Sequence, residues 1–166
     1  LEYSFPQFLA VKHLDRLQYF TSFPHLATFA VTLDRDEDEL TRFSHEHKVL
    51  ENGSLELPKI QPSTHVITPA ACYHAYVEFE GQQFDQPKII TTRGICCRCE
   101  DHYVSLERQW TFSMREIICI GTPEEVHNFL NNAKEKVDRF INKLGINVKW
   151  EGATDPFFNP KNNPKY

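Results

Sequence analysis

Two short runs of the sequence place charged side chains at alternate positions of expected β-strands. In the first run, Arg98 and Glu100 share one strand face with Cys96. The guanidinium of an arginine is a planar fork that suits carboxylates and phosphates, and a charge buried without a partner is costly. The run therefore predicts either ion pairing on a surface or a cleft that binds a polar ligand.

The second run returns an aromatic ring and another carboxylate to the same surface. Phe112, Met114 and Glu116 share one face of the expected returning strand. If the two runs pair as a hairpin, an arginine, two glutamates and a ring converge. An exposed sheet face held by salt bridges is the alternative interpretation, which alternation alone does not separate from a cleft.

Composition excludes several classes of function. The 166 residues are 40% hydrophobic, enough for one domain with a core. The net charge is -5 and basic residues form no run, which disfavours broad binding of RNA or DNA. We see neither a stretch of ~20 apolar residues nor a signal peptide, so we expect a cytoplasmic protein without a membrane partner. The five cysteines are an odd number and are expected to be thiols.

The elements that must position these side chains follow from periodicity and from turn residues. A polar hairpin loop is expected over residues 101–109. The helix over residues 122–145 carries Thr122 as cap, Glu125 completing a capping box, and one apolar face that predicts packing against a sheet. The predicted helices are residues 8–20, 34–50, 68–79 and 122–145, and the predicted strands are residues 27–33, 88–100, 109–120 and 146–153.

The two runs resemble a known signature. "RCE" at residues 98–100 and "FSMRE" at residues 112–116 are similar to the second motif of class II aminoacyl-tRNA synthetases. The surrounding stretches resemble amino acid:[carrier protein] ligases, which are truncated relatives of the archaeal-type seryl-tRNA synthetases. This resemblance implies an α+β fold, with a mainly antiparallel sheet flanked by helices, over a single domain of residues 1–166 that forms part of a catalytic domain. The stretches are "SFPHL" (22–26), "TPAACYHAY" (68–76), "SMREIICIGTPEEV" (113–126) and "DPFF" (155–158).

The resemblance assigns roles to four residues around ATP and its Mg²⁺. Arg98 would contact the α-phosphate and Arg108 the γ-phosphate, while Glu100 would hold the adenine or the amino-acid end of the site. Phe112 would stack on the adenine ring. A salt-bridged arginine at 98, a solvated loop arginine at 108 and a core phenylalanine at 112 are the corresponding structural alternatives.

The resemblance also implies zinc. Cys72 and Glu116 match two of three ligands that hold a zinc ion for the amine of the substrate, and we expect the third ligand beyond Tyr166. A zinc knuckle at residues 96–99 is the rival interpretation. Adjacent cysteines on a strand point to opposite faces and the Cys-x-x-Cys spacing is missing, so small buried side chains are the simpler explanation.

The third class II motif is absent from the sequence, so the nucleotide site is expected to be incomplete within these residues. The hypothesis is ATP-dependent activation of a small amino acid, glycine or alanine, and its transfer to the phosphopantetheine arm of a carrier protein by a homodimeric ligase. A seryl-tRNA synthetase is the rival enzyme; the acidic charge and the lack of a tRNA-binding extension disfavour tRNA. A synthetase-like module without catalysis is the rival outside the enzymes.

Overall fold

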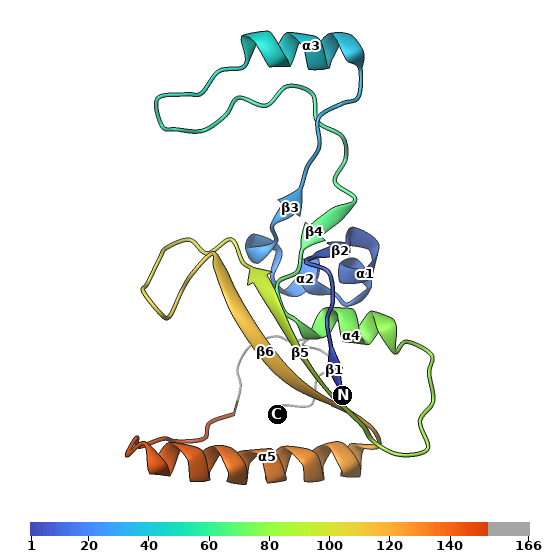
Figure 1. Ribbon diagram of the computed structural model, residues 1–166, viewed down its shortest axis with the longest axis vertical. Helices are drawn as coiled ribbons and strands as arrows, with labels where there is room; N and C mark the ends of the chain where they lie inside the picture. The colour runs from blue at the N-terminus through green and yellow to red at the C-terminus, as the bar shows by residue number, and fades with distance from the viewer. Residues whose placement is uncertain (153–166) are drawn as a thin grey trace.

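The computed structural model describes residues 1–152 and combines two small sheets with short helices (Figure 1). In chain order the elements are β1 (Glu2–Tyr3), β2 (Phe8–Ala10), α1 (Val11–Arg16), α2 (Tyr19–Ser22), the 3-10 helix η1 (Pro24–Leu26), β3 (Phe29–Ala30), α3 (Glu37–Glu46), β4 (His65–Ile67), α4 (Cys72–Glu78), β5 (Lys88–Cys97), β6 (Thr111–Ile120) and α5 (Pro123–Lys143). One sheet has the order β1-β5-β6, and the other has the order β2-β4-β3. Among the strands of residues 1–152, only β1 pairs in parallel, with β5. The predicted α+β class with a mainly antiparallel sheet is therefore confirmed.

The β5–β6 hairpin has the register on which the candidate site depends. Cys96 lies opposite Phe112, and Thr92 lies opposite Glu116. Residues directly opposite in an antiparallel pair point to the same face. The even-numbered side chains of both strands therefore share one face, as the alternation predicts.

The first strand is shorter than predicted at its end. β5 stops at Cys97 instead of residue 100, because the amide of Cys99 donates to the carbonyl of Leu26 at 3.1 Å rather than extending the ladder. Arg98 and Glu100 therefore follow the strand end, where the chain turns toward η1. β6 begins two residues later than predicted, at Thr111.

The N-terminal helix prediction is wrong for its first residues. Phe8–Ala10 forms β2, which pairs with β4 far along the chain, so the helical spacing of residues 8–20 begins only at Val11. The helix then breaks at Gln18, whose φ of 60° is left-handed and separates α1 from α2. Tertiary pairing thus overrides the local pattern.

A long excursion separates β3 from β4. The predicted strand over residues 27–33 is reduced to the two residues of β3. The predicted helix over residues 34–50 is confirmed as α3. Asp36 caps this helix by accepting a hydrogen bond from the amide of Glu39 at 3.0 Å. We call residues 31–62 the arm. The arm carries α3 away from the two sheets (Figure 1).

α4 covers the even-numbered face of the hairpin. A Cβ built on Gly94 would meet the Cβ of Ala71 at 3.6 Å, so the helix approaches the sheet closely. The helix begins at Cys72, later than predicted, and Thr68 does not cap it, because its hydroxyl donates to the carbonyl of Ala70 at 2.7 Å. The main core cluster lies beside this contact and is formed by Leu9, Leu14, Tyr19, Val66, Ala70, Cys72 and Tyr73.

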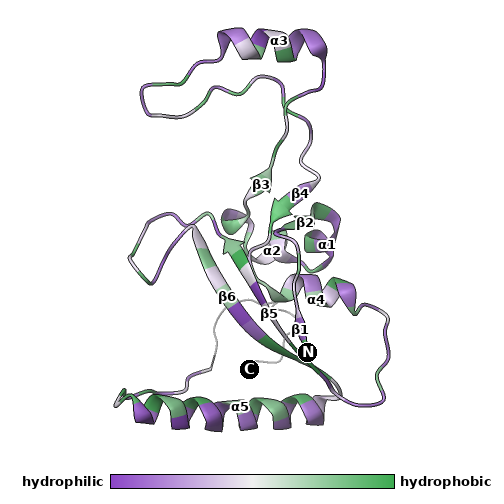
Figure 2. Cartoon of the chain, in the orientation of Figure 1, coloured by the Kyte–Doolittle hydropathy of each residue, from purple (hydrophilic) through white to green (hydrophobic). Residues whose placement is uncertain are grey.

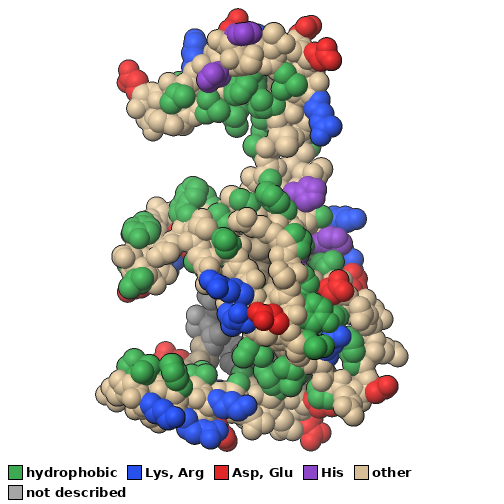
Figure 3. All heavy atoms as spheres, in the orientation of Figure 1, with side chains coloured by type: hydrophobic (Ala, Val, Ile, Leu, Met, Phe, Trp, Pro, Cys, Tyr) green, Lys and Arg blue, Asp and Glu red, His purple; other side chains and the backbone are tan. Residues whose placement is uncertain are grey.

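The last helix is confirmed at its start but not in its packing. Thr122 and Glu125 form the predicted capping box of α5. The prediction that this helix packs against a sheet is wrong for the described residues: none of its residues is buried, and Phe140 is 62% exposed. Figure 2 shows that hydrophobic residues recur along this helix, and Figure 3 shows hydrophobic side chains exposed on it.

The predicted strand over residues 146–153 is wrong as far as residue 152, because the described chain offers it no partner strand. Ala153 and the "DPFF" stretch lie outside the described residues. Within residues 1–152, no helix has both the length and the apolar content needed to cross a bilayer.

Candidate functional site

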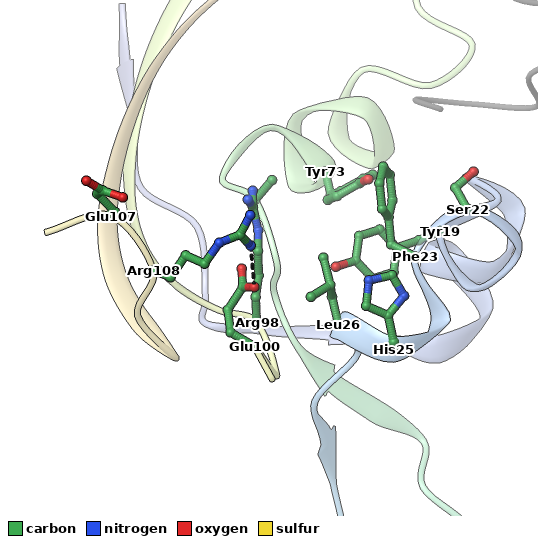
Figure 4. A pocket seen from close by; sticks show the side chains of 11 residues that line it. Tyr19, Ser22, Phe23, His25, Leu26, Tyr73, Arg98, Glu100, Glu107 and Arg108 are labelled. Atoms are coloured by element: carbon green, nitrogen blue, oxygen red, sulfur yellow. Dashed lines mark hydrogen bonds and ion pairs between the residues drawn. The ribbon is translucent and has the colours of Figure 1, made fainter. Parts of the chain in front are cut away.

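A cavity of about 700 Å³ opens between the short helices of the N-terminal part and the end of the β5–β6 hairpin. Three of the residues predicted for nucleotide binding, Arg98, Glu100 and Arg108, line it on the hairpin side (Figure 4). The opposite wall is formed mainly by Tyr19, Ser22, Phe23, His25, Leu26 and Tyr73. The structure thus brings the predicted cations and a carboxylate to one pocket.

Two contacts orient the guanidinium of Arg98. Its Nε donates to the carbonyl of Pro69 at 2.9 Å, and its Cζ lies 5.1 Å from the centroid of the Phe112 ring. The hydrogen bond does not use the two terminal nitrogens, which are the ones that bind an anion as a fork. Phe112 supports this arginine from β6 and does not itself line the cavity.

Glu100 and Arg108 form an ion pair across the base of the hairpin loop. Arg108 Nη1 lies 3.0 Å from Glu100 Oε2, with the Glu100 side chain only 12% exposed and the Arg108 side chain 53% exposed. The indole of Trp110 donates to the carbonyl of Glu100 at 2.8 Å and fixes its backbone. A pair with one partner half in solvent contributes at most about 1 kcal/mol, so Arg108 can leave it cheaply.

Cys72 and Glu116, the two predicted zinc ligands, lie together behind the cavity. Glu116 Oε1 accepts from the amide of Ala71 at 2.9 Å and from the amide of Cys72 at 3.3 Å. Burial raises the pKa of the Cys72 thiol to about 12, and the nearby Glu116 carboxylate raises it further in the same direction. The thiol is therefore protonated near neutral pH in the chain as it stands.

Metal ligation is incomplete in the part of the chain that the structure describes. There, no group of three or more histidine, cysteine, aspartate or glutamate side chains gathers at one point. The rival zinc knuckle is not formed: Cys96 and Cys97 are buried, on opposite faces of β5, and burial raises the pKa of Cys96 to about 11. All five cysteines are free thiols, as predicted.

Sequence reasoning missed the wall opposite Arg98. Tyr19 and Tyr73 are 4% and 2% exposed and line the cavity, yet neither was predicted as a site residue. A signal existed for part of this wall, because Ser22, His25 and Tyr73 fall within the stretches that resemble carrier-protein ligases. Tyr19 lies outside them, in a segment whose helical spacing suggested only core packing.

Curated relatives match nearly the whole chain. Amino acid--[acyl-carrier-protein] ligase 1 of Bradyrhizobium diazoefficiens is 29% identical over 160 residues, which cover 93% of this chain and 47% of that protein. The type-2 serine--tRNA ligase of Methanocaldococcus jannaschii is 24% identical and is covered over 31% of its length. The chain therefore spans about half the length of the ligase that it matches. No protein-family model matches it.

Solved structures share the fold. The seryl-tRNA synthetase of M. kandleri, solved with a tRNASec of A. aeolicus, superposes with a TM-score of 0.72 at 22% identity over 86% of this chain and 29% of that chain. Pyrrolysyl-tRNA synthetase of Desulfitobacterium hafniense gives a TM-score of 0.54 at 17% identity over 94% of this chain and 44% of that chain. The chain is a homologue of the amino acid--[acyl-carrier-protein] ligases and of type-2 seryl-tRNA ligase, and it has the fold of part of a class II aminoacyl-tRNA synthetase domain.

Proposed function

We propose that the protein carrying this chain activates a small amino acid with ATP and transfers it to the phosphopantetheine thiol of a carrier protein. The observation that carries the proposal is Arg98, held by Pro69 and Phe112 at the wall of a 700 Å³ cavity, in a chain similar to named ligases of this kind. A cation fixed before the ligand arrives stabilises developing charge without the cost of reorganisation.

The proposed reaction has two steps, formation of the aminoacyl adenylate and transfer of the aminoacyl group to the carrier thiol. A carboxylate oxygen of the amino acid attacks the α-phosphorus of ATP, the bond to the β-phosphate breaks, and pyrophosphate leaves. The carrier thiol then loses its proton, its sulfur attacks the acyl carbon, and AMP leaves as the C–O bond breaks. Arg98 is the group that would stabilise the charge on the α-phosphate oxygens in the first step.

Other residues would hold the ends of the nucleotide. Arg108 would leave Glu100 and bind the γ-phosphate instead. The Arg108 side chain is half exposed, which makes this exchange of partners easy. Glu100 would then be free for the adenine or the amino-acid end. Phe112, the ring beside Arg98, would stack on the adenine. Mg²⁺ would accompany the phosphates of ATP, as it does in most sites of this chemistry.

Cys72 and Glu116 suit zinc in their donor chemistry. Thiolate and carboxylate are both zinc ligands. The backbone amides of Ala71 and Cys72 donate their hydrogen bonds to Oε1 of Glu116 rather than to Oε2. Cys72 and Glu116 would hold the zinc ion, which would supply a Lewis acid for the substrate amine. The third ligand is proposed to lie beyond Tyr166, and loss of the Cys72 proton would accompany metal binding.

The setting of the reaction is also a proposal. Five free thiols support a reducing compartment, and we place the protein in the cytoplasm as a homodimer that prefers glycine or alanine. Transfer to tRNA is the alternative, favoured by the likeness to a synthetase solved with tRNA but opposed by the net charge of -5. A synthetase-like module without catalysis is the second alternative.

Amino-acid-dependent exchange of labelled pyrophosphate into ATP tests the first step. The full-length protein that carries this chain is assayed with zinc and with glycine, alanine or serine. Exchange with one of them establishes activation, and separate incubations with a phosphopantetheinylated carrier protein and with tRNA then identify the acceptor. Absence of exchange with every amino acid contradicts the proposal and favours the non-catalytic module.

A further inference from the structure

Two hydroxyl groups on α2 are buried without partners. Tyr19 is 4% exposed, and neither its OH nor Oγ of Ser22 has a hydrogen-bond partner among the described residues. The two positions are three residues apart, so they lie on one side of the helix, and both residues line the cavity that contains Arg98.

Such groups are exceptions that need a physical reason. Nearly all buried polar side-chain atoms in folded proteins have a partner, because an unsatisfied hydroxyl loses its hydrogen bonds to water and gains nothing in return. A hydroxyl that lines a cavity and lacks a partner in the free protein can find one when a ligand enters.

Packing holds the Tyr19 ring in one place. Its centroid lies 5.6 Å from that of Tyr73 at an interplanar angle of 86°, and 5.5 Å from that of Phe23. The contact with Tyr73 is edge-to-face, a geometry that stabilises a ring orientation. Figure 4 shows the Tyr19 side chain extending from α2 across the pocket toward the side that carries Arg98 and Glu100.

The surroundings select the kind of group that Tyr19 would meet. Burial raises the pKa of Tyr19 to about 12, so its hydroxyl stays protonated and acts as a donor at neutral pH. Among the charged residues that line the hairpin side of the pocket, Glu100 and Arg108 are already paired with each other. Arg98 is the charge that an incoming ligand would satisfy, and a ligand group drawn to it is an anionic oxygen acceptor.

We propose that Tyr19 is a ligand-binding residue whose hydroxyl donates a hydrogen bond to an anionic oxygen of the ligand that Arg98 contacts. The assignment rests on the proposed function, in which that ligand is an aminoacyl adenylate and the oxygen belongs to its phosphate. Ser22, three residues further along α2, also lines the cavity.

Removal of the Tyr19 hydroxyl oxygen alone distinguishes a ligand-binding role of this group from a structural one. The full-length protein is titrated calorimetrically with the non-hydrolysable sulfamoyl analogues of glycyl and alanyl adenylate, whose sulfonyl oxygens stand in for those of the phosphate. Tyr19→Phe keeps the ring and removes the hydroxyl. Tyr3→Phe is the matched control, because Tyr3 packs against Phe5 and Phe79 and does not line the cavity.

We expect Tyr19→Phe to weaken binding about 10- to 100-fold, the effect of losing a hydrogen bond to a charged group, and Tyr3→Phe to leave the affinity unchanged. The melting temperature of unliganded Tyr19→Phe should equal or exceed that of the wild type, because the unsatisfied hydroxyl is gone. Weaker binding with a higher melting temperature is a combination that a structural hydrogen bond does not produce.

The outcomes are distinct. Wild-type binding that Tyr19→Phe leaves intact overturns the role of Tyr19 and leaves the proposed function standing. A lower melting temperature in Tyr19→Phe assigns the hydroxyl to the fold and also overturns the role. Failure of the wild type to bind either analogue overturns the proposed function together with this inference.

Discussion

Arg98 and Phe112 face each other across the end of the hairpin, with the guanidinium carbon 5.1 Å from the ring centroid. The register places Phe112 opposite Cys96, so the ring is diagonal to Arg98, the first residue beyond the end of β5. A cation over an aromatic face is attracted by the ring quadrupole. Phe112 therefore positions the arginine in the free protein, whatever it does for a nucleotide.

Removing the fork of Arg98 should abolish most of the activation step. We expect Arg98→Ala to lower amino-acid-dependent pyrophosphate exchange by a factor of about 100 or more, because a donor to developing charge is worth that much in other enzymes. Arg98→Lys should recover only part of the loss, since an ammonium lacks the planar fork. Arg115→Ala is the control, because Arg115 lies on the exposed face of β6 and pairs with Glu2. Exchange that Arg98→Ala leaves at wild-type levels would remove Arg98 from the reaction.

The buried thiols should make the fold sensitive to alkali. The ordinary thiol pKa of 9.0 is raised to about 12 at Cys72 and to about 11 at Cys96. Between pH 9 and 11 these two thiols keep their protons in the folded chain and release them in the unfolded chain. Their contribution to the free energy of unfolding is therefore fully present below pH 9 and falls as the pH rises.

The size of the alkaline effect can be measured by urea unfolding at pH 8 and pH 10. Each shifted thiol contributes at most about 1.4 kcal/mol per pH unit, and we expect a total loss of about 1–3 kcal/mol. Cys72→Ala should reduce the difference between the two pH values, whatever its own cost at pH 8. An undiminished difference in that variant would show that Cys72 is not among the groups responsible.

The lysine that begins β5 lies among three aromatic rings. Lys88 Nζ lies 4.7 Å from the ring centroid of Phe79, 5.0 Å from that of Phe84 and 5.9 Å from that of Tyr3. Phe79 and Phe84 follow α4 on the way to β5, whereas Tyr3 lies in β1, so the ammonium links β1 to a segment that is remote from it in sequence.

Lys88→Met keeps most of the aliphatic stem and removes the charge. We expect a loss of about 1–2 kcal/mol in unfolding free energy, because a partly desolvated cation–π contact contributes this much. Lys12→Met, at an exposed position on α1, should change stability by less than about 0.5 kcal/mol. Equal stabilities for the two variants in chemical denaturation would mean that the ring cluster packs as well without the charge.

The features that were predicted correctly are those that depend on residues close together in sequence. The capping box of Thr122 and Glu125 and the alternation of β6 depend on residues within one turn or one strand, and both are present. The strand Phe8–Ala10 was missed because its partner, His65–Ile67, lies more than fifty residues away. The spacing of Arg98 and Phe112 pointed to the hairpin half of the site. On the opposite wall Tyr19 itself was not predictable, because the break at Gln18 that separates α1 from α2 leaves no pattern in the sequence.

α5 exposes an apolar face in the described chain. Leu130 is 51% exposed and Phe140 is 62% exposed in residues 1–152, so Phe140→Lys should change the unfolding free energy of this chain by less than about 0.5 kcal/mol. Thr122→Ala, which removes the cap of the same helix, should cost about 1 kcal/mol and serves as a positive control for the helix. The same pair is then compared in the full-length protein. A loss of about 2 kcal/mol or more from Phe140→Lys there would show that residues outside 1–152 cover this face, because a charge buried in an apolar contact is costly. An effect as small as in the isolated chain would leave α5 as a solvent-exposed helix, with its apolar stripe uncovered in the whole protein.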